Sequence, residues 1–118
     1  MSDRQVVNLH DLELQRVAAH DGVGEILWRR VFHQHDFQGP WNFVDYAVLP
    51  PGTSIGRHQH ESDEELYLVL EGEGLMELDG NEFPVRPGSV ILNRPHGTHG
   101  LRNVSTSAIR IFVVEVRA

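Results

Sequence analysis

The fold is decided by residues 52–72, which read GTSIGRHQHESDEELYLVLEG. Two histidines, His58 and His60, stand two residues apart, and Glu65 opens the apolar run that follows. In a β-strand, residues i and i+2 point to the same face, about 6.6 Å apart, and the twist of the strand allows their side chains to converge on one ion. A neighbouring antiparallel strand can bring Glu65 beside the two imidazoles. Imidazole and carboxylate ligands suit Mn, Fe, Co, Ni, Cu or Zn, so the stretch predicts a site for one divalent transition metal.

A second stretch, residues 88–103, reads GSVILNRPHGTHGLRN and contains another histidine pair. Together the two stretches resemble the two sequence motifs of the cupin superfamily. The first motif is a Gly, five residues, His-x-His, three or four residues, a Glu, six residues and a Gly; it is matched by Gly52, His58, His60, Glu65 and Gly72. The second motif is matched by Gly88, His99 and Asn103. It departs from the family pattern before His99, where Arg94 replaces the usual Pro and His96 the usual Gly.

This resemblance implies an all-β fold of the cupin type, a double-stranded β-helix or jelly-roll barrel, with an N-terminal strand and loop extension. It also implies a metal site with four protein ligands, His58, His60, Glu65 and His99. On a six-coordinate ion, four protein ligands leave two positions for water, dioxygen or a substrate. Members of this family commonly pair through N-terminal strands, so a homodimer is expected.

Glu64 is the alternative acidic ligand, because the first motif also tolerates three residues between the second histidine and the Glu. Glu65 is favoured for two reasons: it stands six residues before the last Gly of the motif, and it shares a strand face with Tyr67. On this interpretation Leu66 and Leu68 occupy the opposite face of the strand and point towards the core. Glu64 is then expected on the surface or behind the ligands.

Composition and charge exclude several classes of protein. A chain of 118 residues is long enough for one domain with a single packed core. The formal charge of −7 argues against a nucleic-acid partner, and all ten basic residues are Arg, so no lysine is available for Schiff-base chemistry. The absence of cysteine excludes thiolate metal ligands. The polar N-terminus and the short apolar runs predict neither a signal peptide nor a membrane span, and a cytoplasmic protein is expected.

Short apolar runs recur between turns rich in Gly, Pro, Asn and Asp, and none keeps a helical period over the length of a helix. This pattern favours an antiparallel sandwich or barrel. Besides the His-x-His segment, strands are expected within residues 25–32, 42–49, 65–70, 75–78, 83–85, 90–93, 99–103 and 108–116. Residues 1–40 are assigned to the N-terminal extension, with edge strands that contribute to the dimer interface, and residues 41–118 to the barrel of the same domain.

Several further side chains are candidates for chemistry. Tyr67 is expected to point into the barrel, either as a core aromatic or as a catalytic group that orients or protonates a substrate. His96 is either a solvated loop residue or a catalytic acid or base at the pocket rim, because imidazole titrates near neutral pH. Arg94 either binds a substrate carboxylate or lies on the surface. Four others are assigned to the surface, an interface or the outside of the barrel: His33, His35, Arg57 and Arg102.

Two functions from different classes fit these expectations. The first is a metal-dependent enzyme that acts on a small oxygenated metabolite, as a dioxygenase, decarboxylase, isomerase or cyclase. A fold shared by so many chemistries leaves the reaction and the substrate open. The alternative is a non-catalytic module that binds a small ligand and uses its metal only as an anchor.

Overall fold

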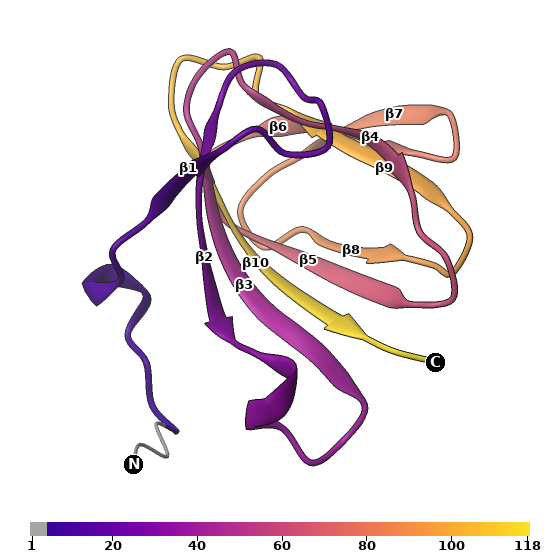
Figure 1. Ribbon diagram of the computed structural model, residues 1–118. Helices are drawn as coiled ribbons and strands as arrows, with labels where there is room; N and C mark the ends of the chain where they lie inside the picture. Colours follow the sequence, from indigo (N-terminus) through magenta and orange to yellow (C-terminus); the bar gives the residue numbers. More distant parts are fainter. Residues whose placement is uncertain (1–4) are drawn as a thin grey trace.

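The computed structural model describes residues 5–118 and shows two antiparallel β-sheets that face each other (Figure 1). The larger sheet contains, in spatial order, β1 (Gln15–Val17), β2 (Ile26–Phe32), β3 (Trp41–Leu49), β10 (Ile109–Val116), β5 (Glu64–Glu71) and β8 (Val90–Asn93). The smaller sheet contains β4 (Ser54–Gln59), β9 (Thr98–Arg102), β6 (Gly74–Leu78) and β7 (Asn81–Val85). The predicted all-β jelly-roll fold is therefore confirmed.

Two single-turn 3-10 helices complete the described elements, η1 (Leu9–Asp11) before β1 and η2 (Gln34–Asp36) between β2 and β3. Within residues 5–118, no helix is long and apolar enough to cross a membrane. The first four residues of the predicted N-terminal extension lie outside the described residues. Strand β2 falls inside that extension and pairs with β3 in the larger sheet, while the division of the chain at residue 40 stays a prediction.

Strand β10 lies in the middle of the larger sheet, between β3 and β5. Its inward side chains Ile109, Ile111 and Val113 are buried in the barrel, and its outward side chains Phe112 and Val114 are partly buried. A strand with neighbours on both sides and packing on both faces needs apolar residues throughout. The central position predicted from the two apolar faces of residues 108–116 is confirmed.

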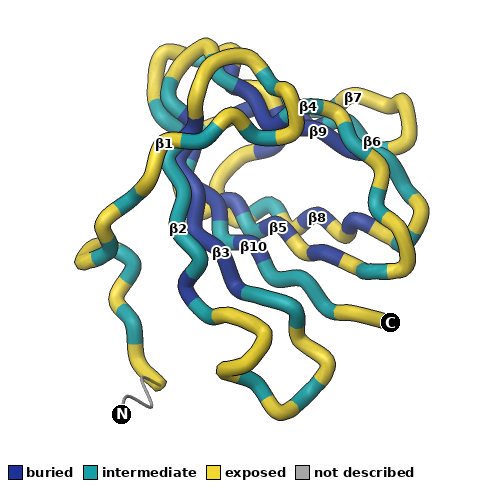
Figure 2. Tube along the Cα trace, in the orientation of Figure 1, coloured by how far each residue is buried: buried dark blue, intermediate teal, exposed yellow. Residues whose placement is uncertain are grey.

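Apolar side chains pack on both faces of the larger sheet. The main core lies inside the barrel, where the most buried residues include Leu49, Val69, Met76, Leu101 and Ile111. A second core lies on the outer face of β2 and β3 and is formed by Val31, Val44, Tyr46 and Val48. The N-terminal segment covers this second core with Val7, Leu9, Leu12 and Leu14. Consecutive residues of β3, from Val44 to Leu49, are buried (Figure 2).

The prediction that Leu66 and Leu68 face the core was wrong. Strand β5 turns Glu65, Tyr67 and Val69 inwards, whereas Leu66 is 43% exposed and Leu68 is only partly buried. Both faces of this strand carry apolar residues, so alternation alone does not identify the inward face. Pairing with β10 and β8 decides it, because a strand's register fixes which set of side chains enters the barrel.

The loop between β1 and β2 packs tightly against β4. Its backbone bonds to the edge of that strand, because the Gly56 N–H donates to the Ala19 carbonyl (2.9 Å) and the Ser54 N–H to the Val23 carbonyl (3.0 Å). A Cβ added to Gly56 would lie 1.9 Å from the His20 carbonyl oxygen, so only glycine fits there. The contact covers one of the two edges of the smaller sheet, at β4, and holds His20 beside this strand.

Replacing Gly56 by Ala should lower the free energy of unfolding by about 3 kcal/mol, because the new methyl group must push two backbones apart. Gly80→Ala is the matched control. Gly80 has φ 87° and nothing lies within 4 Å of its added Cβ, so this variant should lose about 1 kcal/mol through left-handed backbone strain alone. Urea unfolding measures both losses, and equal values would contradict the close approach of the loop to β4.

Candidate metal centre

Three strands and one loop residue bring the four predicted metal ligands together. His58 on β4 stands directly opposite His99 on β9, His60 follows the end of β4, and Glu65 lies on β5 in the other sheet. One donor atom from each of the four lies within 4.8 Å of the others. Ligands on opposite sides of an ion with bonds of about 2.1 Å are separated by about 4.2 Å. The spacing of the group therefore suits a single metal ion.

The donor atoms face one another inside the barrel. The His60 Nε2 atom lies 3.2 Å from Glu65 Oε1 and 3.3 Å from His99 Nε2, and His99 Nε2 lies 3.5 Å from the same Glu65 oxygen. His99 and Glu65 are buried. Lone pairs that converge in an apolar interior repel one another unless a proton or a cation lies among them. The donor set thus fits a divalent transition metal of the predicted kinds.

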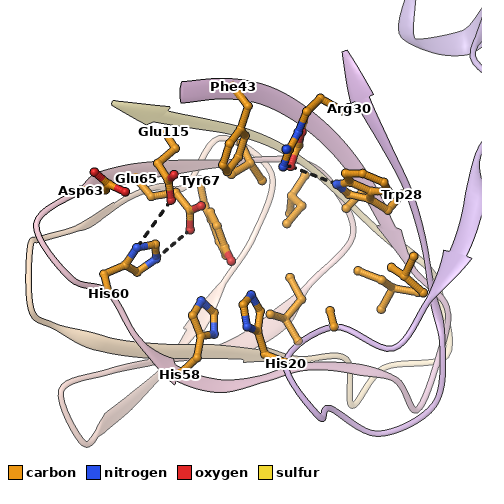
Figure 3. Close-up of a pocket in the computed structure, with 18 of the residues that line it drawn as sticks. His20, Trp28, Arg30, Phe43, His58, His60, Asp63, Glu65, Tyr67 and Glu115 are labelled. Atoms are coloured by element: carbon orange, nitrogen blue, oxygen red, sulfur yellow. Dashed lines mark hydrogen bonds and ion pairs between the residues drawn. The ribbon is translucent and has the colours of Figure 1, made fainter. Parts of the chain in front are cut away.

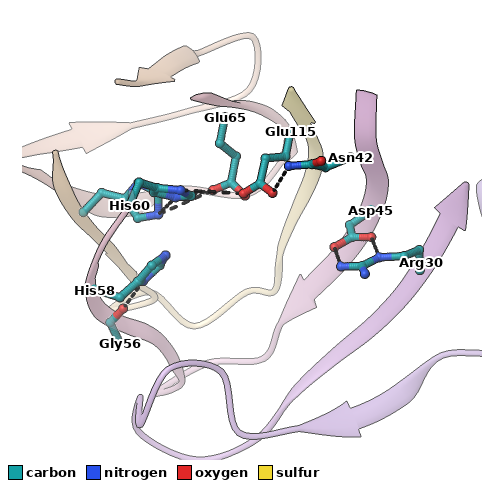
Figure 4. Close-up of polar contacts among 9 residues, drawn as sticks. Arg30, Asn42, Asp45, Gly56, His58, His60, Glu65 and Glu115 are labelled. Atoms are coloured by element: carbon teal, nitrogen blue, oxygen red, sulfur yellow. Dashed lines mark hydrogen bonds and ion pairs between the residues drawn. The ribbon is translucent and has the colours of Figure 1, made fainter. Parts of the chain in front are cut away.

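Neighbouring groups orient two of the imidazoles. The His58 Nδ1 atom lies 2.8 Å from the Gly56 carbonyl oxygen and donates to it, which leaves Nε2 as the metal-facing atom. The His60 Nδ1 atom lies 3.6 Å from Glu115 Oε1, and the Asn42 amide donates to the other Glu115 oxygen at 2.9 Å (Figure 4). Such partners fix the tautomer and the ring plane of a ligating histidine.

Burial prepares the histidines for metal binding to different degrees. The pKa of His99 is lowered to about 3, first by burial and then by its neighbours His58 and His60. Burial also lowers the pKa of His58. The pKa of His60 is raised, chiefly by its hydrogen bond to Glu65. Because a ligating imidazole must be neutral, the lowered pKa values of His58 and His99 favour metal binding, whereas the raised pKa of His60 makes a proton a stronger competitor of the metal at that nitrogen.

A cavity of about 590 Å³ is lined by three of the ligands, His58, His60 and Glu65 (Figure 3). Tyr67 is 3% exposed and points its ring into this space, with the ring centroid 5.3 Å from that of His99. Burial raises the pKa of its hydroxyl well above 10, so the group stays a neutral phenol that can donate a hydrogen bond. Apolar side chains from both sheets also line the cavity, among them Ile26, Ala47, Ile55, Ile111 and Val113. The cavity therefore combines a polar end with an apolar body, as small-molecule sites do.

The other sequence candidates lie elsewhere. Glu64 is exposed and stands outside the cluster, while the neighbouring Glu65 carboxylate lies within it. His96 is exposed, adopts a left-handed φ of 64° and lines a separate shallow hollow with residues 59–62. Arg94 is exposed. The remaining pairs lie on the outside: His33 stacks on His35, Arg57 binds Glu77, and Arg102 binds Glu82.

The structure adds one histidine that the sequence did not single out. His20, from the loop between β1 and β2, stacks on His58 with ring centroids 3.5 Å apart and planes 10° from parallel. His20 and the next residue, Asp21, both have positive φ, 51° and 57°. Two consecutive non-glycine residues in the left-handed region are uncommon, and such strain concentrates at functional sites. His20 also lines the cavity, so it stands within reach of a bound ligand.

The model of the cupin domain matches residues 45–115 of this chain. The chain belongs to the cupin family. Its relatives include the oxalate-binding protein of Thermotoga maritima, which is 26% identical over 110 residues that cover 92% of this chain and 91% of the relative. An uncharacterised protein of Methanocaldococcus jannaschii is 32% identical over 83 residues, 70% of this chain and 66% of that protein.

Solved cupin structures share the fold. A protein from Thermotoga maritima described as a predicted oxalate decarboxylase superposes with a TM-score of 0.93 at 24% identity, covering 97% of this chain and all of the other. The polyketide cyclase RemF of Streptomyces resistomycificus has a TM-score of 0.80 at 22% identity, covering 97% of this chain and 79% of its own. At these identities the likeness concerns the fold.

Replacing either His58 or His99 by Ala should weaken metal binding more than about tenfold, because each removes a donor that the barrel holds in place. His33→Ala is the matched control, since His33 is exposed and far from the cluster in the sequence. Elemental analysis of the purified variants for Mn, Fe, Co, Ni, Cu and Zn gives the metal content per chain. Wild-type metal content in both the His58 and the His99 variants would reject these ligands.

Proposed function

We propose that the protein binds one divalent transition metal through His58, His60, Glu65 and His99 and acts as a metal-dependent enzyme on a small oxygenated metabolite. The observation that carries this proposal is the convergence of the four donors at the end of a cavity large enough for a metabolite. A bound ion would serve as a Lewis acid and as a template for a pair of substrate oxygens.

The residues around the ligands have different roles in this proposal. Tyr67, a neutral phenol at the inner wall, is the catalytic residue of this proposal because it can orient or protonate a substrate oxygen. The apolar wall excludes water from the bound substrate. His96 lies outside the lining of the cavity, which supports the solvated-loop interpretation of this residue.

Among the four reaction classes open to the sequence, we propose decarboxylation of an oxalate-like acid first. Support comes from the relative named as an oxalate-binding protein, which aligns over almost the whole of both chains. That same relative is named for binding rather than turnover, so a non-catalytic ligand-binding module is the second candidate. Cyclisation, which the sequence also left open, remains a further class to test.

Metal-loaded protein supplied with oxalate should convert each molecule, with uptake of one proton, into one CO₂ and one formate, without net consumption of oxygen. Tyr67→Phe should lower the turnover about 10²-fold while metal content is unchanged, because it removes a proton donor and no ligand. An oxygen electrode and a CO₂ assay are run on the same samples. Oxygen consumption would instead select the dioxygenase class, and saturable oxalate binding without either gas change would select the binding module.

We also propose that the protein forms a homodimer, as the family resemblance predicts. The family resemblance places the dimer contact at the N-terminal strands. A second supporting feature is a group of exposed apolar side chains on the outer face of β5 and β8, namely Leu66, Leu70, Val90 and Leu92. Contiguous apolar surface of this kind is typical of protein contacts. Light scattering should give twice the mass of one chain, and Val90→Asp should lower the mass if this face contributes. The mass of a single chain for the wild type would contradict the dimer.

A further inference from the structure

An arginine and an aspartate form a rigid pair in the wall of the cavity. Arg30 on β2 stands directly opposite Asp45 on β3. Its Nε donates to Asp45 Oδ1 at 2.9 Å and its Nη2 to Asp45 Oδ2 at 3.2 Å (Figure 4). The Trp28 indole N–H donates to the same Oδ2 at 3.0 Å. Asp45 is 6% exposed, and these hydrogen bonds give both of its oxygens a partner inside the barrel.

The guanidinium of Arg30 keeps one edge free. Its central carbon lies 4.1 Å from the ring centroid of Phe43 and 5.4 Å from that of Trp28, so two aromatic rings hold its plane (Figure 3). The side chain is 34% exposed and lines the cavity. Within residues 5–118, its Nη1 atom makes no hydrogen bond. A fixed guanidinium with an unpaired edge matches the two oxygens of a carboxylate.

The sheet register sets the span between this edge and the metal centre. Phe43 and Asp45 lie on β3, Glu65 lies on β5, and β10 runs between these two strands. Two strand spacings correspond to about 9.5 Å between backbones. On β10, Glu115 pairs with Phe43 on one side and with the ligand Glu65 on the other, and Val113, on the same face, pairs with Asp45 and Tyr67. The wall between the two ends therefore carries one carboxylate and, beside it, one apolar side chain. Oxalate, whose two carboxylates are directly bonded, is too short to reach both ends.

Arg30 differs in charge from most of the ionisable groups that line the cavity, which are acidic. The acidic side chains there are Glu61, Asp63, Glu65, Glu115 and Asp45. Arg30 is the one arginine among the lining residues, and the chain contains no lysine. Apart from a bound metal ion and the histidines, an anionic group that enters the cavity finds its cationic partner at this position.

We propose that Arg30 is a second anchoring point in the cavity and that the substrate or ligand is a dicarboxylic acid longer than oxalate. One carboxylate binds the free edge of Arg30, the carbon chain lies along the apolar wall at Val113, and the other end supplies oxygens to the metal site. This inference rests on the proposed metal site: oxalate, which reaches only the metal end, is a weaker ligand than a longer member of the same chemical class.

Calorimetric titration of Mn²⁺-loaded protein with the dicarboxylates from oxalate to adipate tests the span. Affinity should rise from oxalate to a maximum at a longer member. Each dicarboxylate has a monocarboxylate of equal length as its control, such as butyrate for succinate. The best dicarboxylate should bind about tenfold or more tightly than its control, because only the dicarboxylate can form the pair of charge-assisted hydrogen bonds with Arg30. Tightest binding of oxalate would overturn the proposal.

Two variants test the residue. Arg30→Gln combined with Asp45→Asn removes both charges, so that no buried carboxylate is left unpaired and the fold is retained. This variant should keep its metal content and lose the tenfold preference for the dicarboxylate. Arg29→Gln is the matched control, since Arg29 is the next residue on β2 and donates instead to the Glu13 carbonyl at 2.8 Å; it should keep the preference.

The outcomes separate the two proposals. A dicarboxylate preference that survives in the Arg30 double variant overturns the anchoring role, even where the metal is bound. Failure of the wild-type protein to bind metal overturns the proposed function and this inference with it. Loss of the preference in the double variant alone, with metal content unchanged, supports both.

Discussion

Four nitrogen and oxygen donors converge inside an apolar barrel, and this concentration of lone pairs is the constraint on which the rest of the structure depends. Polar groups buried together are costly unless each finds a partner. The Gly56 carbonyl accepts a hydrogen bond from His58, and the Glu115 carboxylate lies beside the outer nitrogen of His60. The inner nitrogen of His60 contacts Glu65. These contacts still leave the inward atoms facing one another, and a divalent cation is the partner that would satisfy all of them at once.

The N-terminal segment is tied to this centre in two ways. Residues 7–14 cover the outer face of β2 and β3, which holds in place the strands that carry Arg30 and Asp45. The next loop then bonds to the edge of β4 and lays His20 over the His58 ring. This placement of His20 requires a strained, left-handed backbone at His20 and Asp21. The close packing of the loop against Gly56 stabilises that conformation.

The cavity has two polar ends, and its shape links the proposed chemistry to a class of ligand. At one end the ligands and Tyr67 can bind and polarise oxygens. At the other end Arg30 lies clamped between Phe43 and Trp28, with Asp45 holding it from behind. A space of about 590 Å³ between them exceeds what a two-carbon acid requires. The similarity to an oxalate-binding protein therefore fits the chemical class of the ligand better than its size.

The sequence by itself determined the all-β fold and the grouping of His58, His60, Glu65 and His99. Motif spacing and strand alternation act over a few residues, and each motif lies on two consecutive strands, the first on β4 and β5 and the second on β8 and β9. The sequence did not determine the orientation of Leu66 and Leu68, because both faces of β5 are apolar and only pairing with β10 selects the inward face.

The tertiary structure alone decided the places of His20, Arg30 and Glu115. Each comes from a segment far from the motif in sequence, and the order β1-β2-β3-β10-β5-β8 brings these segments beside it. Glu115 reaches His60 because β10, the last strand, inserts between β3 and β5. Such pairings between distant strands depend on the packing of the whole barrel, which leaves no local pattern of residues to read.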